Sequence, residues 1–232
     1  MLHIHLKKCQ STQQYLKSYL AKLPKSNTKN ILISTDIQTN GHGRHKRNWI
    51  QYKDSIALSF KYQSQLMPTL IPLAIGVGMV GFIQNHFNLK AQLKWPNDIF
   101  YKNKKIGGII CQTYKSEYII GIGLNIFNQN NHFDHGFLLQ EEVRSKFNAY
   151  DLTSALFQYL SQLNFSIQDV LKTWKIHCYH LNQIVFVKDE QFEFYGKFLG
   201  IAKNGEALIE DLNSKNVRKI LSGSIYPDLR ST

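Results

Sequence analysis

The sequence predicts an α+β fold: a mixed β-sheet with flanking helices, followed by a small β-barrel. Strand and helix patterns are interspersed from residue 2 to about residue 180, whereas only short strand patterns occur from residue 182 onward. Of the 232 residues, 43% are hydrophobic and 12% aromatic, enough to bury one large core and one small one. We therefore predict a main domain at 1–181 and a β-barrel domain at 182–232.

The first half of the chain is predicted from periodicity and capping. Residues 2–6 alternate apolar and polar side chains, as in a half-buried strand. Ser11, with Gln14 three positions later, is typical of a capping box that opens a helix extending to about Leu23. The further elements predicted here are strands at 31–35 and 55–62, a polar and basic loop at 39–48, and a mostly buried helix at 68–87.

The second half contains short strands, two helices and then strands alone. In the main domain we predict strands at 93–95, 99–101, 108–114 and 118–126, and helices at 152–163 and 167–179. In the second domain we predict strands at 184–187, 192–201, 206–211 and 217–221. Asn204-Gly205 is typical of a hairpin turn, which favours a compact all-β unit.

Charge, cysteines and hydropathy restrict the function classes. Lys and Arg outnumber Asp and Glu by 28 to 16, a net charge of +12 that favours anionic partners without choosing among nucleotides, nucleic acid and acidic proteins. The three scattered cysteines, Cys9, Cys111 and Cys178, suggest reduced thiols. The N-terminus has no signal-peptide pattern, and the longest nearly apolar run, 70–83, is too short to cross a bilayer. We expect a cytoplasmic protein without membrane attachment.

The segment Gly41–Trp49, GHGRHKRNW, is the first candidate for ligand binding. Its glycines allow backbone N–H groups to approach a ligand, and its Arg and Lys side chains can meet phosphate oxygens. By composition alone, a solvated basic turn explains the segment equally well. A second, independent motif is therefore needed.

That second motif is Lys94-Trp95-Pro96-Asn97-Asp98, followed by KIGGI at 105–109 and GIGLN at 121–125. Together with Ser11-Thr12-Gln13-Gln14-Tyr15 and Gln38, these segments have the order and approximate spacing of the catalytic domain of biotin protein ligases. Over residues 2–180 the chain resembles this family. The resemblance implies a fold like that of the class II aminoacyl-tRNA synthetases, with an SH3-like barrel after it. Because the strand pattern begins at residue 2, we expect the monofunctional type of biotin protein ligase, without an N-terminal DNA-binding domain.

The resemblance implies a role for each matching residue. The residues implied to contact biotin are Ser11, Thr12, Gln13, Gln38, His42, Gly43, Arg44, Lys94 and Gly108. Those implied to contact the nucleotide are Arg44, Arg47, Trp49, Asn97, Asn125 and Phe137. Lys94 and Arg44 are the implied catalytic residues. Mg²⁺ is expected to accompany ATP with unassigned ligands, and neither a protein-held metal nor a permanently bound cofactor is expected.

Two departures from the family pattern change the expectations. The usual loop reads GRGRxGRxW, whereas here His42 replaces the first Arg and Lys46 the third Gly, so we expect altered affinity rather than lost function. The segment Ser222–Asp228, SGSIYPD, departs from the corresponding segment of many relatives, which carries an acid and an Arg near the active site. The contribution of the C-terminal domain to ATP binding is therefore left open.

The implied reaction has two steps. The biotin carboxylate attacks the α-phosphorus of ATP and pyrophosphate leaves; a lysine amine of an acceptor protein then attacks the adenylate and AMP leaves. Because both first-step reactants are anions, we expect catalysis by positioning and charge neutralisation, from Lys94, Arg44, Arg47 and Mg²⁺. The loop at 39–48 and the segment 128–135 would close over the adenylate and exclude water.

The implied acceptor is an acidic biotin carboxyl carrier protein or domain of a biotin-dependent carboxylase, and a homodimer is left open. Two other functions also stay open. The first is a lipoate or octanoyl ligase or transferase of the same fold, which ligand selectivity would separate. The second is a nucleic-acid-binding regulator, although no DNA-reading module is visible and specific DNA binding is not expected.

Two remaining patterns are interpreted as structural. Residues 76–81 spell GxGxxG, but they lie inside an apolar helical run without a preceding strand, so helix packing explains them better than a dinucleotide-binding loop. The histidine pairs in 132–135 and 177–180 have no third ligand set that would indicate a metal.

Overall fold

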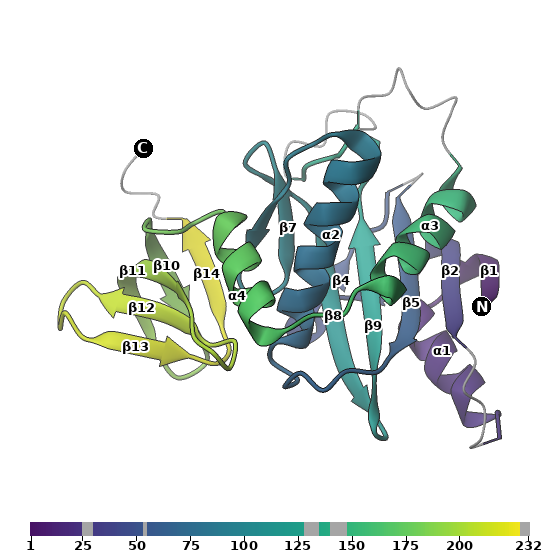
Figure 1. The fold of residues 1–232 in the computed structure, drawn as a ribbon, viewed down its shortest axis with the longest axis horizontal. Coiled ribbons are helices and arrows are strands. Elements are labelled where there is room, and N and C mark those ends of the chain that lie inside the picture. Colours follow the sequence, from purple (N-terminus) through teal and green to yellow (C-terminus); the bar gives the residue numbers. More distant parts are fainter. Residues whose placement is uncertain (25–29, 53–54, 128–134, 140–147, 228–232) are drawn as a thin grey trace. The chain divides into compact units, whose positions relative to one another are not determined.

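The computed structural model describes residues 1–24, 30–52, 55–127, 135–139 and 148–227 (Figure 1). It divides into two compact units, Met1–Gln65 with Ile99–Leu163, and Leu66–Asp98 with Asn164–Thr232. Because each unit joins segments that are distant in the sequence, this division does not test the boundary predicted between residues 181 and 182. That boundary stays a prediction.

The first unit is built on a mixed β-sheet. Its strands lie in the order β1-β2-β5-β9-β8-β7. Their bounds are β1 (Leu2–Cys9), β2 (Ile31–Gln38), β5 (Ile56–Tyr62), β7 (Asp98–Tyr101), β8 (Lys104–Tyr114) and β9 (Glu117–Leu124). The pair β1–β2 is parallel, whereas β2–β5, β5–β9 and β8–β9 are antiparallel. The predicted mixed sheet with flanking helices is confirmed.

Two helices pack on opposite faces of this sheet, α1 (Thr12–Ala21) and α3 (Ala149–Gln162). Leu16 of α1 packs with Ile31, Ile33 and Ile119. Neighbouring strand residues point to opposite faces, so Ser34 lies on the other face, where His3 links it to Ser154 of α3. We call the two sides the α1 face and the α3 face.

The second unit contains helices α2 (Ile71–Phe87) and α4 (Ile167–Ile176), the short strand β6 (Gln92–Lys94) and a five-stranded sheet. The sheet has the order β13-β12-β11-β10-β14. Its strands are β10 (Ile184–Lys188), β11 (Glu193–Ile201), β12 (Ala207–Asp211), β13 (Val217–Ile220) and β14 (Ser224–Pro227). The sheet is open between β13 and β14 over the described residues, so the predicted barrel is not confirmed.

Helix α2 settles one ambiguous sequence pattern. It includes the GxGxxG residues 76–81, and Gly76 and Gly78 are buried within it. The interpretation of this pattern as helix packing is therefore confirmed. No helix in the described part of the chain combines the length and the apolar character needed to cross a membrane.

Candidate active site

The start of α1 brings together residues that are far apart in the sequence. Ser11 caps the helix and accepts a hydrogen bond from the Gln14 N–H at 3.4 Å, as the capping pattern predicts. Thr12 is only 3% exposed. Its backbone N–H and its hydroxyl both donate to Oε1 of Gln38, at 2.9 and 3.2 Å, and the hydroxyl also bonds Ser59 Oγ at 2.8 Å. The predicted biotin residues Ser11, Thr12 and Gln38 are thus neighbours.

Small residues line the α1 face beside this helix. Ile33 lies opposite Ser59, and Ser59 opposite Gly121, so all three share that face. Gly123 is two residues further along β9, and Gly108 lies opposite it on β8. This register places the predicted residue Gly108 on the same face as α1.

Two of these glycines permit close approach by other predicted site residues. A Cβ at Gly121 would press against the side chain of Gln13, which donates to the Ile119 carbonyl at 3.4 Å. A Cβ at Gly123 would overlap the indole of Trp49. The bare backbone of β9 therefore seats both Gln13 and Trp49 on the α1 face.

The predicted basic loop at 39–48 contains a short hairpin. Strands β3 (Gly41–His42) and β4 (Asn48–Trp49) pair antiparallel, and Arg44–Lys46 form a single 3-10 turn between them. The Gly43 N–H donates to the Arg47 carbonyl at 2.6 Å. Arg44 and Gly43 are half-buried, whereas His42 and Arg47 are exposed. The loop therefore presents most of its charge to solvent.

The backbone of this loop explains one departure from the family pattern. His45 and Lys46 have φ values of 53° and 56°, in the left-handed region that favours glycine. Lys46 stands where the family usually has Gly. Lys46 therefore adds a cation at a backbone conformation that Gly would adopt more readily, with a conformational penalty of roughly 1 kcal/mol.

Asn125 supports the segment that carries Phe137. It is buried, its N–H donates to the Ile106 carbonyl at 2.7 Å, and its Nδ2 donates to the Gly136 carbonyl at 3.2 Å. Its Oδ1 is buried without a hydrogen-bond partner among the described residues. The Phe137 ring lies 5.1 Å from that of Tyr52. Asn125 and Phe137 are thus brought together, next to a tyrosine that the sequence does not single out.

Lys94 and Asn97 belong to the second unit. Lys94 ends β6, and its Nζ lies 5.7 Å from the ring centroid of Tyr226 on β14, within cation–π range. Trp95, only 2% exposed, donates through Nε1 to the Gly205 carbonyl at 3.0 Å. Burial, and secondarily the charge of Lys94, lower the pKa of His180 to about 3. Lys94 is therefore flanked by an aromatic ring and a neutral histidine.

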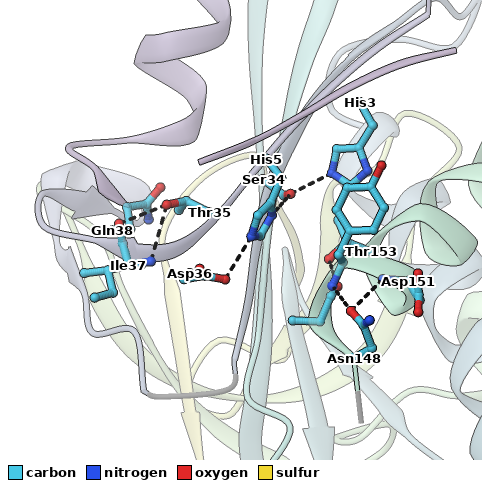
Figure 2. Close-up of polar contacts among 12 residues, drawn as sticks. His3, His5, Ser34, Thr35, Asp36, Ile37, Gln38, Asn148, Asp151 and Thr153 are labelled. Atoms are coloured by element: carbon cyan, nitrogen blue, oxygen red, sulfur yellow. Dashed lines mark hydrogen bonds and ion pairs between the residues drawn. The ribbon is translucent and has the colours of Figure 1, made fainter. Parts of the chain in front are cut away.

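A row of polar side chains on the α3 face is absent from the sequence predictions (Figure 2). Ser34 Oγ lies 2.7 Å from His3 Nε2 and 2.8 Å from His5 Nδ1, and His5 Nε2 lies 2.9 Å from Asp36 Oδ1. Burial, and then the neighbouring His5, lower the pKa of His3 to about 4. Although the order Ser–His–Asp resembles a hydrolase triad, Ser34 is 2% exposed and its hydroxyl is shared by two imidazoles. We interpret the row as a link between β1, β2 and α3.

The thiols are poor nucleophiles. Cys9, Cys111 and Cys178 are free, and burial raises the pKa of Cys111 and of Cys178 to about 12. Burial also raises the pKa of Cys9. Because the thiolate is the reactive form, these cysteines are unsuited to covalent catalysis at neutral pH.

Two predicted segments lie partly outside the described residues. In the segment 128–135, proposed to help close the site, only His135 is described; its Nδ1 lies 2.8 Å from the Tyr52 hydroxyl. Asp228 also lies outside the described residues. Among the residues that are described, no group of three His, Cys, Asp or Glu side chains could hold a metal ion.

The fold and these motifs define a family. The model of the Biotin/lipoate A/B protein ligase family matches residues 6–126, more than half of the chain. The chain therefore belongs to the Biotin/lipoate A/B protein ligase family. The matched range contains the start of α1, the basic loop, Lys94 and Asn125.

The chain is also similar to individual curated proteins. The chain is 27% identical over 214 residues to the bifunctional ligase/repressor BirA of Bacillus subtilis, covering 84% of this chain and 65% of that protein. The chain is 26% identical over 217 residues to the bifunctional ligase/repressor BirA of Escherichia coli, covering 86% of this chain and 66% of that protein. The chain thus spans just under two thirds of the length of these curated relatives.

A solved structure resembles nearly the whole chain. The biotin protein ligase from Aquifex aeolicus in complex with biotin and ATP superimposes with a TM-score of 0.75 at 25% identity, covering 97% of both chains. The mixed α+β architecture described above is therefore that of a biotin protein ligase.

Proposed function

We propose that the protein is a biotin protein ligase, which activates biotin with ATP to biotinyl-5′-AMP and transfers biotin to a specific lysine of an acceptor protein. The observation that carries the proposal is the cluster at the start of α1. Ser11, Thr12, Gln13 and Gln38 lie beside the glycines of β8 and β9 on one face of the sheet. The family membership and the Aquifex similarity support the same activity.

The cluster suits the ureido group of biotin because both are polar and uncharged. A ureido group has two N–H donors and one carbonyl acceptor, and the cluster offers hydroxyl and amide groups that can donate and accept. Gly121 and Gly123 leave room for the side chains of Gln13 and Trp49, and we assign Gly108 to leave backbone beneath the ligand's rings. Buried polar groups of this kind discriminate strongly, since a ligand without matching groups leaves them unpaired.

The first step needs cations because the biotin carboxylate and the α-phosphate of ATP repel each other. We assign Lys94 and Arg44 to neutralise the negative charge of these two groups. Arg47 would contact the phosphates, and Mg²⁺ would enter with ATP. Trp49, Asn97, Asn125 and Phe137 are assigned to the nucleotide. The pKa values of the cysteine thiols agree with a mechanism that has no covalent enzyme intermediate.

The second step needs exclusion of water, because water competes with the acceptor lysine for the mixed anhydride. We assign this role to the basic loop, whose half-buried Arg44 and Gly43 would cover the adenylate with His42. The acceptor would be an acidic biotin carboxyl carrier protein or domain, which the net charge of +12 would attract.

Finer parts of the proposal concern the molecule as a whole. They are a cytoplasmic location, the absence of specific DNA binding, a homodimeric assembly as an open alternative, no permanently bound cofactor, and an SH3-like barrel formed by residues 182–232. Each stays a prediction.

The alternative within the family is a lipoate or octanoyl ligase or transferase. Lipoyl and octanoyl chains have no ureido group, so they would match none of the donor and acceptor capacity that Thr12, Gln13 and Gln38 keep beyond their bonds within the protein. The polar cluster therefore favours biotin.

The test is to incubate the protein with ATP labelled at the α-phosphate and with biotin, lipoate or octanoate in parallel. The proposal predicts a labelled biotinyl-adenylate and little product with the other two acids. A preference for lipoate or octanoate would assign the alternative, and retention on DNA at physiological salt without any adenylate would favour a nucleic-acid-binding regulator.

A further inference from the structure

Gln51 is a residue that none of the sequence motifs includes, yet its side chain connects both ends of the basic loop. It is half-buried and follows β4 by two residues. Its Oε1 accepts a hydrogen bond from the backbone N–H of Gln38 at 2.7 Å. Its Nε2 donates to the backbone carbonyl of Asp36 at 2.9 Å and to that of Thr35 at 3.3 Å. One amide thus contacts three backbone groups at the end of β2.

These contacts replace a missing strand partner. The pairing of β2 with β1 continues to Gln38, which lies opposite Cys9. The pairing of β2 with β5 covers only residues 32–34. Among the described residues, the backbone of β2 beyond Ser34 therefore has no ladder on its β5 side, and the Gln51 amide supplies both a donor and an acceptor there, as a peptide group would.

The strand end held in this way carries Gln38. The Oε1 atom of the Gln38 side-chain amide accepts a hydrogen bond from the Thr12 N–H. Its Nε2 atom lies so close to Gly41 that a Cβ there would collide with it. Thr35 adds a local bond, its hydroxyl accepting from the Ile37 N–H at 3.3 Å (Figure 2). The Gln38 side chain is thus fixed by the helix and the hairpin, and its backbone by Gln51.

The same bonds fix the base of the basic loop. Residues 38 and 51 flank the hairpin in which Gly41 pairs with Trp49 and His42 with Asn48. A hydrogen bond between residues 13 apart holds the two stems at one separation, and so limits the orientations of the loop between them.

We propose that Gln51 is a positioning residue for the reaction: its amide orients Gln38 toward biotin and holds the stem of the basic loop closed over the adenylate. The consequences for ligands rest on the proposed function, whereas the consequence for the Gln38 backbone does not.

The principal test replaces Gln51 with Met, which has a similar length but cannot form these bonds. We expect biotin affinity to fall about tenfold and preformed biotinyl-adenylate to dissociate several times faster, because about two net hydrogen bonds are lost. The maximal rate of adenylate synthesis at saturating biotin and ATP should change less than twofold. Gln112→Met, an exposed glutamine on β8, is the matched control and should leave both quantities unchanged.

Two further variants separate positioning from general support of the fold. Gln51→Glu keeps the acceptor for the Gln38 N–H but loses the donors, so it should weaken biotin binding at least as much as Gln51→Met; wild-type affinity would overturn the proposal. Gln51→Asn keeps the amide on a shorter side chain that cannot reach the same backbone groups, so it should also weaken biotin binding. This variant provides a test if the Met variant does not fold.

A double-mutant cycle tests whether Gln51 acts through Gln38. If it does, the losses of biotin affinity in Gln51→Met and Gln38→Ala should not add in the double variant. Full additivity would contradict this route.

Hydrogen exchange of the Gln38 amide gives a readout that needs no ligand. It should be faster in Gln51→Met than in wild type, with the exchange of the core strands unchanged. If wild type bound no biotin, the proposed function would fail while this readout still tested Gln51. If wild type bound biotin but the Met variant matched it in affinity and in exchange, the inference about Gln51 alone would be wrong.

Discussion

The start of α1 and the basic loop lie next to each other in the first unit, but they are built in opposite ways. The first is neutral, and its central residue Thr12 is buried and bonded to both Gln38 and Ser59. The second is cationic and mostly exposed, with a left-handed backbone at His45 and Lys46. Under the proposed function this difference would divide the work: the preorganised neutral cluster would select the acid, and the charged groups would act on the phosphate and retain the adenylate.

Removal of the proposed catalytic lysine should have the largest effect. Lys94→Ala is expected to lower adenylate synthesis by about 10²–10³-fold, as for deletion of one oxyanion donor, because its ammonium would act on charge that shifts during the reaction. A rapid-quench assay of adenylate formation measures this, with Lys90→Ala, an exposed lysine of the same unit, as control. A normal rate in Lys94→Ala would make Lys94 a structural residue.

Removal of one hydroxyl from the neutral cluster should come next. Thr12→Val keeps the shape of the side chain but leaves Ser59 without this partner, so biotin affinity should fall about tenfold. Titration calorimetry with biotin alone checks this, and Thr12→Ser, which retains the hydroxyl, should stay near wild type. Equal affinities in the Val and Ser variants would remove Thr12 from the biotin site.

Loss of the half-buried arginine of the loop should affect retention of the intermediate. Arg44→Ala is expected to speed the release of preformed biotinyl-adenylate by about fivefold, roughly 1 kcal/mol, while it weakens biotin binding less. Lys46→Gly removes a cation from the same loop but suits its left-handed backbone, and it should release the adenylate more slowly than Arg44→Ala. An unchanged release rate in Arg44→Ala would contradict the retaining role.

Salt should have the smallest effect, and it should act on the two steps differently. If the charge of +12 steers an acidic acceptor, transfer from preformed enzyme-adenylate should slow as the Debye length falls from about 10 Å at 0.1 M salt to about 3 Å at 1 M. Adenylate formation over the same salt series is the reference. Equal slopes would leave the lysines and arginines as a solvated surface that aids solubility.

The sequence predicted the parts of the fold that have a local signal. Ser11 and Gln14 located the start of α1, and the apolar run of α2 marked a buried helix. Helix α3 begins at Ala149 rather than at the predicted residue 152, because Asn148 caps it by accepting from the N–H groups of Tyr150 and Asp151. An Asn three residues before an apolar run is a cap signal that could have located this start.

The sequence did not predict features that depend on contacts between distant residues. The bonds of Gln51 to the end of β2 join side chain to backbone and follow no periodicity. The same is true of the His3–Ser34–His5 row, whose two strands become neighbours only through the parallel pairing of β1 with β2. The open order of the C-terminal sheet also depends on which strands pair at its ends, and short strand patterns do not specify that.

The most direct test of the division of labour is one titration with biotin, without ATP, on wild type, Thr12→Val and Arg44→Ala. The neutral cluster, and not the loop cation, should determine this affinity. We predict a loss of about tenfold in Thr12→Val and a clearly smaller loss in Arg44→Ala. An Arg44→Ala variant that lost as much biotin affinity as Thr12→Val, or a Thr12→Val variant that bound like wild type, would contradict the account.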